Sequence, residues 1–198
     1  MRNEEQKRQR ITAEAARIMA EEGVRDFQMA KRKAAARLNL PEHRNNLPSN
    51  EEVQAALEQH LLLFHGPRLA QDVRRLREVA LGAMEFFEAF DPRLVGSVLI
   101  GTVTPESEIE LHITADTPEE VGLLLQERGI PYVQDERRLR FGGDRYETFP
   151  TYRLTADDTA VEVCVFTPRA ARELPLSPVD GRPIKRVGWK EVSALLKE

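Results

Sequence analysis

Three acidic residues have the types and the spacing that could support chemistry. Glu108 and Glu110 lie two residues apart in the segment 108–114, which alternates polar and apolar side chains. Because successive side chains of a β-strand point to opposite faces, both carboxylates leave the same face. Glu162 lies inside the apolar run 160–166, where a carboxylate needs a cation, a hydrogen-bonding partner or a proton. If the two strands are neighbours, the three carboxylates converge.

Such a convergence suits one or two divalent cations, because hard oxygen ligands favour Mg²⁺ or Mn²⁺. Two of these ions can stabilise the attacking and leaving oxygens of a phosphoryl transfer. Two simpler readings stay open. The pair Glu108 and Glu110 can be the polar face of a half-exposed strand, and Glu162 can pair with one of the arginines.

The dipeptide Gly96–Ser97 adds a second element. A glycine lets backbone amides approach a phosphate closely, and a serine hydroxyl can donate a hydrogen bond to it. Ser97 precedes Glu108 by eleven positions, so the chain has room to turn back and run the acidic strand beside the strand before Gly96. We therefore expect the phosphate-binding turn and the carboxylates to share one cleft, although a Gly-Ser pair alone is most often a simple turn.

Residues 96–111, GSVLIGTVTPESEIEL, resemble the signature of the DNA polymerase β-like nucleotidyltransferase superfamily. That signature is Gly-Ser, a short helix with a second glycine, and then Ser-Asp-Ile-Asp-Leu. Beyond Gly-Ser, the positions that match without a gap are Gly101, Ser107, Ile109 and Leu111. Glu162 lies where the family places its third acid, and the resemblance covers about residues 91–166.

The resemblance implies a metal-dependent transfer of a nucleotidyl group from a nucleoside triphosphate, as in small bacterial proteins with this domain. The acceptor would be an RNA end, a protein hydroxyl or a small molecule. It implies that Glu108, Glu110 and Glu162 are catalytic and ligate Mg²⁺ or Mn²⁺, and that Gly96 and Ser97 bind the nucleotide.

Two departures from the family pattern support an alternative. Glutamates stand in place of the paired aspartates, and Leu99–Ile100 replaces the usual small residue and arginine. The extra methylene of glutamate displaces a bound ion, and ångström-scale misplacement can cost orders of magnitude in rate. The alternative is a catalytically weakened protein of the same fold that binds nucleotide or RNA, or acts as a regulatory interaction module.

Several other side chains accompany these acids. Five arginines surround a predicted hairpin and could hold a triphosphate or an RNA backbone, or simply face solvent: Arg137, Arg138, Arg140, Arg145 and Arg153. His112 shares the face of the acids, and we expect a hydrogen-bonded surface histidine rather than an outer metal ligand. Cys164 is expected to be an inert buried thiol.

The elements that must position these residues fall into two halves. The first half reads as helices over 8–22 and 26–38, a loop over 45–50, and a helix that begins at Ser49 or Asn50. Gly66–Pro67 is expected to break that helix. A long helix with an apolar stripe from Leu69 to Phe90 should then follow and pack on a sheet.

The second half changes to strand periodicity. The pattern predicts strands over residues 94–95, 108–114 and 160–166 and a hairpin over 139–146. It also predicts a helix over 117–129, capped by Thr117, and a final helix over 188–196. The prediction is an α+β fold with a small mixed sheet flanked by helices. We expect a helical region over 1–90 and a nucleotidyltransferase-like domain over 91–198.

Composition narrows the function classes. Of 198 residues, 41% are hydrophobic and 31% charged, which is too apolar for a disordered chain. A single cysteine excludes an intramolecular disulfide, and histidines 43, 60, 65 and 112 have no paired metal-ligand spacing. Without a long apolar run or an apolar start, we expect a cytoplasmic protein with no membrane partner. Residues 1–40 hold ten Lys/Arg and six Asp/Glu, a weakly basic arm that fits solvated helices better than nucleic-acid binding.

Overall fold

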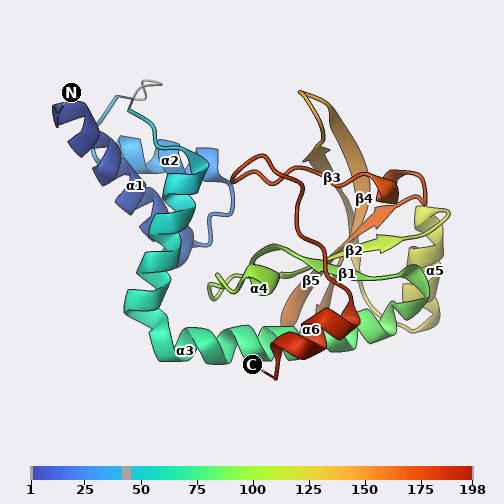
Figure 1. The fold of residues 1–198 in the computed structure, drawn as a ribbon. Helices are drawn as coiled ribbons and strands as arrows, with labels where there is room; N and C mark the ends of the chain where they lie inside the picture. The colour runs from blue at the N-terminus through green and yellow to red at the C-terminus, as the bar shows by residue number, and fades with distance from the viewer. Residues whose placement is uncertain (1, 42–45, 198) are drawn as a thin grey trace. The chain divides into compact units, whose positions relative to one another are not determined.

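The structure is a computed structural model that describes residues 2–41 and 46–197. It has the predicted α+β class (Figure 1). His43 and Asn45, the expected first residue of a loop, lie outside the described residues. The chain divides into two compact units: one holds residues 1–70, 102–106 and 178–180, and the other holds the remainder. The division falls inside helix α3 (Asn50–Phe86), so this helix contributes residues to both units.

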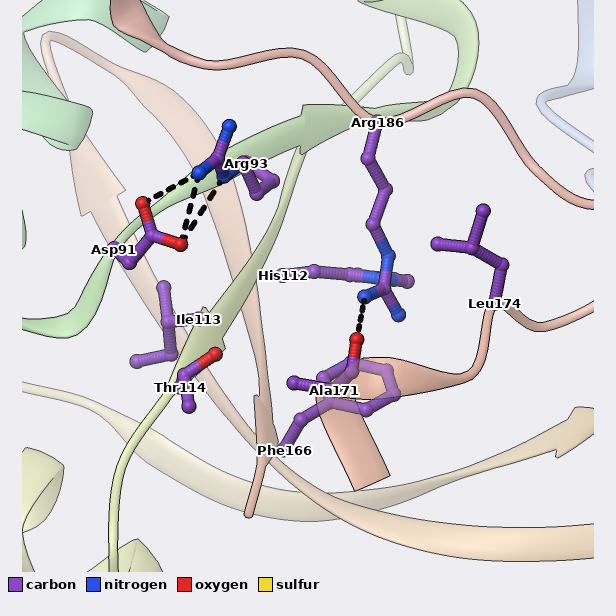
Figure 2. A pocket seen from close by; sticks show the side chains of 9 residues that line it. All are labelled: Asp91, Arg93, His112, Ile113, Thr114, Phe166, Ala171, Leu174 and Arg186. Atoms are coloured by element: carbon purple, nitrogen blue, oxygen red, sulfur yellow. Dashed lines mark hydrogen bonds and ion pairs between the residues drawn. The ribbon is translucent and has the colours of Figure 1, made fainter. Parts of the chain in front are cut away.

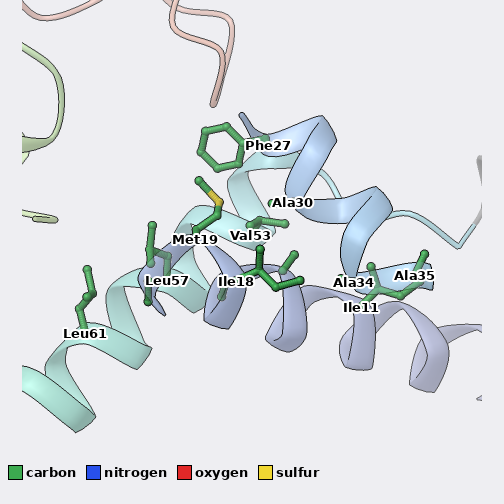
Figure 3. Close-up of a cluster of buried hydrophobic side chains, with 13 residues drawn as sticks. Ile11, Ile18, Met19, Phe27, Ala30, Ala34, Ala35, Val53, Leu57 and Leu61 are labelled. Atoms are coloured by element: carbon green, nitrogen blue, oxygen red, sulfur yellow. The ribbon is translucent and has the colours of Figure 1, made fainter. Parts of the chain in front are cut away.

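The first unit is built from α1 (Arg2–Glu22), α2 (Phe27–Arg37) and the first part of α3. α1 ends at Gly23, whose φ of +65° is accessible to glycine without strain. α2 begins where the Asp26 side chain accepts a hydrogen bond from the Met29 amide at 2.6 Å. Apolar side chains from all three helices form the core shown in Figure 3, among them Ile11, Ile18, Phe27, Val53, Leu57 and Leu61.

Helix α3 begins with a reciprocal cap and does not end where the sequence predicts. The Glu52 amide donates to the Ser49 hydroxyl at 3.1 Å, and the Ser49 amide donates to the Glu52 carboxylate at 2.7 Å. The predicted break at Gly66–Pro67 is wrong, because α3 continues through Pro67 to Phe86. A proline removes one backbone hydrogen bond at a cost of about 3 kcal/mol. Buried residues on both sides, such as Leu61 and Leu76, offset that local cost.

The second unit contains a five-stranded sheet in the order β1-β2-β5-β4-β3. β2 and β5 run parallel, and the other neighbouring pairs are antiparallel. The strands are β1 (Arg93–Val95), β2 (Ile109–Thr114), β3 (Val133–Arg140), β4 (Tyr146–Ala156) and β5 (Thr159–Phe166). The smaller elements are α4 (Gly96–Ile100), α5 (Pro118–Glu127), α6 (Trp189–Leu195), η1 (Glu88–Phe90) and η2 (Ala170–Arg172).

The second part of α3 belongs to this unit and is bonded to the elements around it. The Arg77 guanidinium donates to the carbonyls of Val98 and Leu99 at 3.2 and 3.0 Å. Arg75 donates to the Thr159 hydroxyl at 3.2 Å. This part of the helix buries an apolar stripe of Leu76, Ala80, Ala83 and Met84, which Phe87 continues just beyond the helix end. The helix therefore positions both α4 and the start of β5.

Strand β2 shows the predicted alternation, with Ile109, Leu111 and Ile113 fully buried on one face. β4 and β5 are joined at Asp157 and Asp158, whose positive φ values of 45° and 57° are typical of a tight hairpin turn. Over the described ranges, no helix is both long and apolar enough to span a bilayer.

Candidate active site

The three acidic residues converge on one face of the sheet. In the parallel pair β2 and β5, Glu110 lies directly opposite Glu162, so both side chains leave the same face. Glu108, one residue before β2, joins them through a shared arginine. The carboxylate side chains of Glu108, Glu110 and Glu162 keep only 18%, 12% and 14% of their accessible surface. The expected convergence is therefore present, because β2 and β5 are neighbours in the sheet.

Gly96 lies against this cluster at the point where β1 passes into α4. Its φ is +75°, and a Cβ at this position would lie 2.5 Å from Oε1 of Glu110. Only glycine fits here without displacing the carboxylate. Ser97, the next residue, donates its hydroxyl to the Ser107 hydroxyl at 3.4 Å. Gly96–Ser97 thus borders the acidic cluster, as the sequence leads one to expect.

Two arginines from the β3–β4 hairpin lie among the carboxylates. Nη1 of Arg137 contacts Oε2 of Glu110 at 2.7 Å and also contacts Oε1 of Glu162. Nη2 of Arg153 contacts both oxygens of Glu108 at 3.0 Å and lies 3.9 Å from Oε2 of Glu162. One guanidinium nitrogen therefore bridges two carboxylates that come from two parallel strands.

The electrostatics of the cluster follow from this arrangement. Burial disfavours the charged form of Arg137, but the charges of Glu110 and Glu162 outweigh it, so the pKa of Arg137 is raised. The guanidinium stays charged at every physiological pH. Arg137 and Arg153 thus compensate much of the negative charge that the three carboxylates bring together.

The donor chemistry of the cluster fits a hard divalent cation, because every side-chain ligand on offer is a carboxylate oxygen. The Glu110 carboxylate occupies the space beside Gly96 where a side chain would begin, 2.5 Å from the position of a Cβ. The carboxylates now surround a guanidinium, whereas Mg²⁺ holds oxygens at about 2.0–2.1 Å. Accordingly, no group of three or more acidic, histidine or cysteine side chains in residues 2–41 and 46–197 has the spacing of a metal site. A cation would have to replace Arg137.

The remaining arginines of the hairpin do not reach the acidic cluster in the contacts described. Arg138 stacks over the Tyr146 ring, with 4.3 Å between the guanidinium carbon and the ring centroid. Arg145 pairs with Glu147 and Glu173 at the exposed end of the hairpin. The five predicted arginines thus separate into different surroundings, and only Arg137 and Arg153 face the acids.

Two other predicted residues lie further along the same sheet face. Cys164 is a buried thiol, as predicted, and burial raises its pKa to about 12, so it is unsuited to act as a nucleophile. The prediction of a surface histidine at 112 is wrong. His112 is only 5% exposed, and its Nδ1 has no hydrogen-bonding partner within the part of the chain that the structure describes. Its neighbours on β1 and β5, together with η2, enclose the ring.

Sequence reasoning did not single out Arg137 and Arg153 from the other arginines. Arg153 lies directly opposite Glu162 in the antiparallel register of β4 and β5. That register is set by the turn at Asp157–Asp158, so counting outward from the turn would have identified the pair. Arg137 carries no comparable signal, because it reaches the cluster from β3, beyond β4.

Comparison with known proteins adds no family to these observations. The chain matches no known family model, and a search of curated proteins finds no significant relative.

Proposed function

We propose that this chain is a divalent-cation-dependent nucleotidyltransferase whose site is formed by Glu108, Glu110 and Glu162 with Gly96–Ser97. The observation that carries the proposal is the direct pairing of Glu110 with Glu162 on parallel strands, with a glycine required beside Glu110. This pairing brings the carboxylates beside the backbone of Gly96, where the proposal puts the phosphates. The resemblance of residues 96–111 to the nucleotidyltransferase signature supports the same chemistry.

The residues of the chain have separable roles in this proposal. Gly96 admits the triphosphate close to the backbone, and the Ser97 hydroxyl donates a hydrogen bond to it. Glu162 accepts the proton of the acceptor hydroxyl as that oxygen attacks the α-phosphorus and pyrophosphate leaves. The three glutamates would hold Mg²⁺ or Mn²⁺, which, when bound, neutralises charge on the phosphates.

Arg137 and Arg153 then serve two states of the same site. In one state both arginines pair with the acids. With a cation, the freed guanidinium groups are placed to pair with phosphate oxygens, for which their planar fork is well suited. The acceptor in this proposal is an RNA end, a protein hydroxyl or a small molecule.

A second candidate is favoured by the same arginines. Because Arg137 already bridges Glu110 and Glu162, the fold can persist as a nucleotide- or RNA-binding or regulatory module without turnover. The second candidate differs from the first in that no nucleotidyl group is transferred.

Calorimetry and radiolabelling test the two candidates separately. Titration of a nucleoside triphosphate should show binding with Mg²⁺ that a chelator weakens at least tenfold. Glu110→Gln should weaken the Mg²⁺-supported affinity tenfold or more, since it removes a ligand and a charge. Glu147→Gln is the matched control, because it breaks an arginine pair of the same hairpin away from the cluster. Equal affinity with Mg²⁺ and with chelator would reject the proposed site.

Incubation with each α-labelled triphosphate, Mg²⁺ or Mn²⁺, and cellular RNA or protein tests turnover. Label that enters an acceptor in the wild type, and falls at least 100-fold in Glu110→Gln, supports the transferase. Cation-dependent binding without transfer supports the second candidate.

A further inference from the structure

A separate cavity lies on the sheet face that carries the acids, two residues further along β2. His112 follows Glu110 at that spacing, and successive residues of one strand face are about 6.6–6.8 Å apart. The cavity has a volume of about 270 Å³ and includes none of the three glutamates in its lining. Phe166, Leu174 and Ala171 supply apolar walls, as Figure 2 shows.

His112 extends from β2 toward Arg186 in this cavity (Figure 2). An imidazole carries at least one ring N–H that it can donate. Nδ1 is enclosed without a partner among the described side chains and backbone groups. Such a buried polar atom costs about 1–3 kcal/mol unless something satisfies it.

Arg186 presents a second set of unsatisfied donors. Its Nη1 donates to the Ala171 carbonyl at 3.4 Å, and its guanidinium lies over the Phe166 ring, 4.5 Å from the centroid. Its Nε and Nη2 are enclosed and have no acceptor within the described ranges. These two nitrogens form one edge of the guanidinium, the edge that binds both oxygens of a carboxylate or phosphate. The unpaired atoms are thus those that an oxyanion requires.

The charges of the residues that line the cavity also favour an anion. Arg93 also lines it, but both oxygens of Asp91 bind Arg93 at 2.8–3.3 Å. Asp91 is the acidic residue of the lining, so its charge is used by Arg93 and not by Arg186. The lining keeps one uncompensated positive charge next to an imidazole and apolar walls. Burial also lowers the pKa of Arg186, which an anion would reverse.

We propose that this cavity binds a small oxyanion, a carboxylate or a phosphate, through the Nε–Nη2 edge of Arg186 with His112 as a second donor. A modest rotation about the arginine side-chain bonds turns this edge to the ligand. None of the three glutamates lines this cavity, so the inference stands without the proposed function.

The test uses the full chain with three probes: acetate, inorganic phosphate and acetamide, the neutral isostere of acetate. Imidazole resonances of His112 are followed by NMR during each titration at constant ionic strength. We expect a saturable shift with acetate or phosphate and none with acetamide. Saturation by acetate alone identifies a carboxylate site, and saturation by phosphate alone identifies a phosphate site.

Two variants assign the binding to Arg186. Arg186→Gln should weaken the oxyanion affinity at least tenfold. Lys185→Gln, an exposed neighbour with the same loss of charge, should leave the affinity within twofold. The proposal is overturned if neither oxyanion gives a saturable shift, if acetamide gives the same shift as acetate, or if Arg186→Gln binds as the wild type does. The acetate and acetamide comparison needs no variant, so it holds even if Arg186→Gln is unstable.

Discussion

Two networks of arginines and glutamates lie in different units and illustrate different physics. In the helical unit, Arg37 on α2 pairs with Glu22 and Glu14 on α1, and Arg17 pairs with Glu14 and Glu21. The glutamate side chains of this network keep between 17% (Glu14) and 44% (Glu21) of their accessible surface. In the sheet unit, Arg137 pairs with Glu110 and Glu162, whose side chains keep only 12% and 14% of their accessible surface.

The two networks differ in how much water their charged groups lose on folding. Exposed pairs are screened by solvent and contribute little, even though the hydrogen bonds of Arg37 and Lys33 lower the pKa of Glu22 to about 2. Carboxylates held on the sheet have lost water, so each depends on its partner. Buried like charges that converge from separate strands cost stability, and such costs concentrate at functional sites. We therefore place function in the second network and not in the first.

The largest expected effect comes from a truncation that removes the second part of α3, compared with a truncation that keeps it. A fragment of residues 91–198 lacks the stripe of α3 with Leu76, Met84 and Phe87, and each large apolar side chain contributes about 1.5–3 kcal/mol of burial. We expect no cooperative thermal unfolding from it. A fragment of residues 71–198 keeps the stripe and the sheet network without the helical network, and it should unfold cooperatively. A cooperative transition from the shorter fragment would contradict the dependence on α3.

Replacing Arg137 by methionine should have the next largest effect. It leaves Glu110 and Glu162 facing one another, and we expect a loss of about 2–3 kcal/mol in the free energy of unfolding in chelator. This figure is below that of a fully buried pair because the Arg137 side chain keeps 36% of its surface. Chemical denaturation with and without Mg²⁺ measures it. Mg²⁺ should restore more stability to Arg137→Met than to the wild type, and an equal response would argue against a cation site between these acids.

Acid should act on the two units in different pH ranges. The pKa of buried His112 is lowered in the folded state, so the unfolded chain binds more protons as pH falls below 6.5. Stability should then fall by up to about 1.4 kcal/mol per pH unit. His112→Gln should flatten this slope, whereas His65→Gln on α3 should not. Denaturation midpoints between pH 7 and pH 5 provide the measurement.

The contribution of Glu22 to stability changes over a lower pH range than that of His112. Its folded pKa is lowered to about 2, so its contribution is present above its ordinary value of 4.5 and is lost as pH falls from there toward 2. Because the group is exposed, the change should be small.

The smallest effect is expected from Arg37→Met. It removes both contacts to Glu22 and Glu14, yet solvent replaces them on the exposed helix face. The melting temperature should stay within the error of calorimetry at physiological salt. A drop as large as that of Arg137→Met would mean that burial does not separate the two networks.

The amino-acid sequence alone determines the local features of the site. Alternation places Glu108 and Glu110 on one strand face, because side chains of a strand have a period of two. The end of α1 at Glu22 and both ends of α2 agree with the prediction within one residue for similarly local reasons, whereas α1 begins at Arg2, six residues before the predicted start. The predicted α+β class follows from the change of period along the chain, and the structure confirms it.

Tertiary structure alone decides what depends on distant segments. Pro67 is a helix breaker by local rules, but burial on both sides carries α3 through it. The pairing of β2 with β5 brings Glu110 opposite Glu162 across about fifty residues of chain, and no local pattern specifies that neighbour. Arg137 reaches the same acids from β3, which no period of its own strand encodes. Short-range sterics and periodicity are written in neighbouring residues, whereas the partner of a buried charge is set by which strands the whole core brings together.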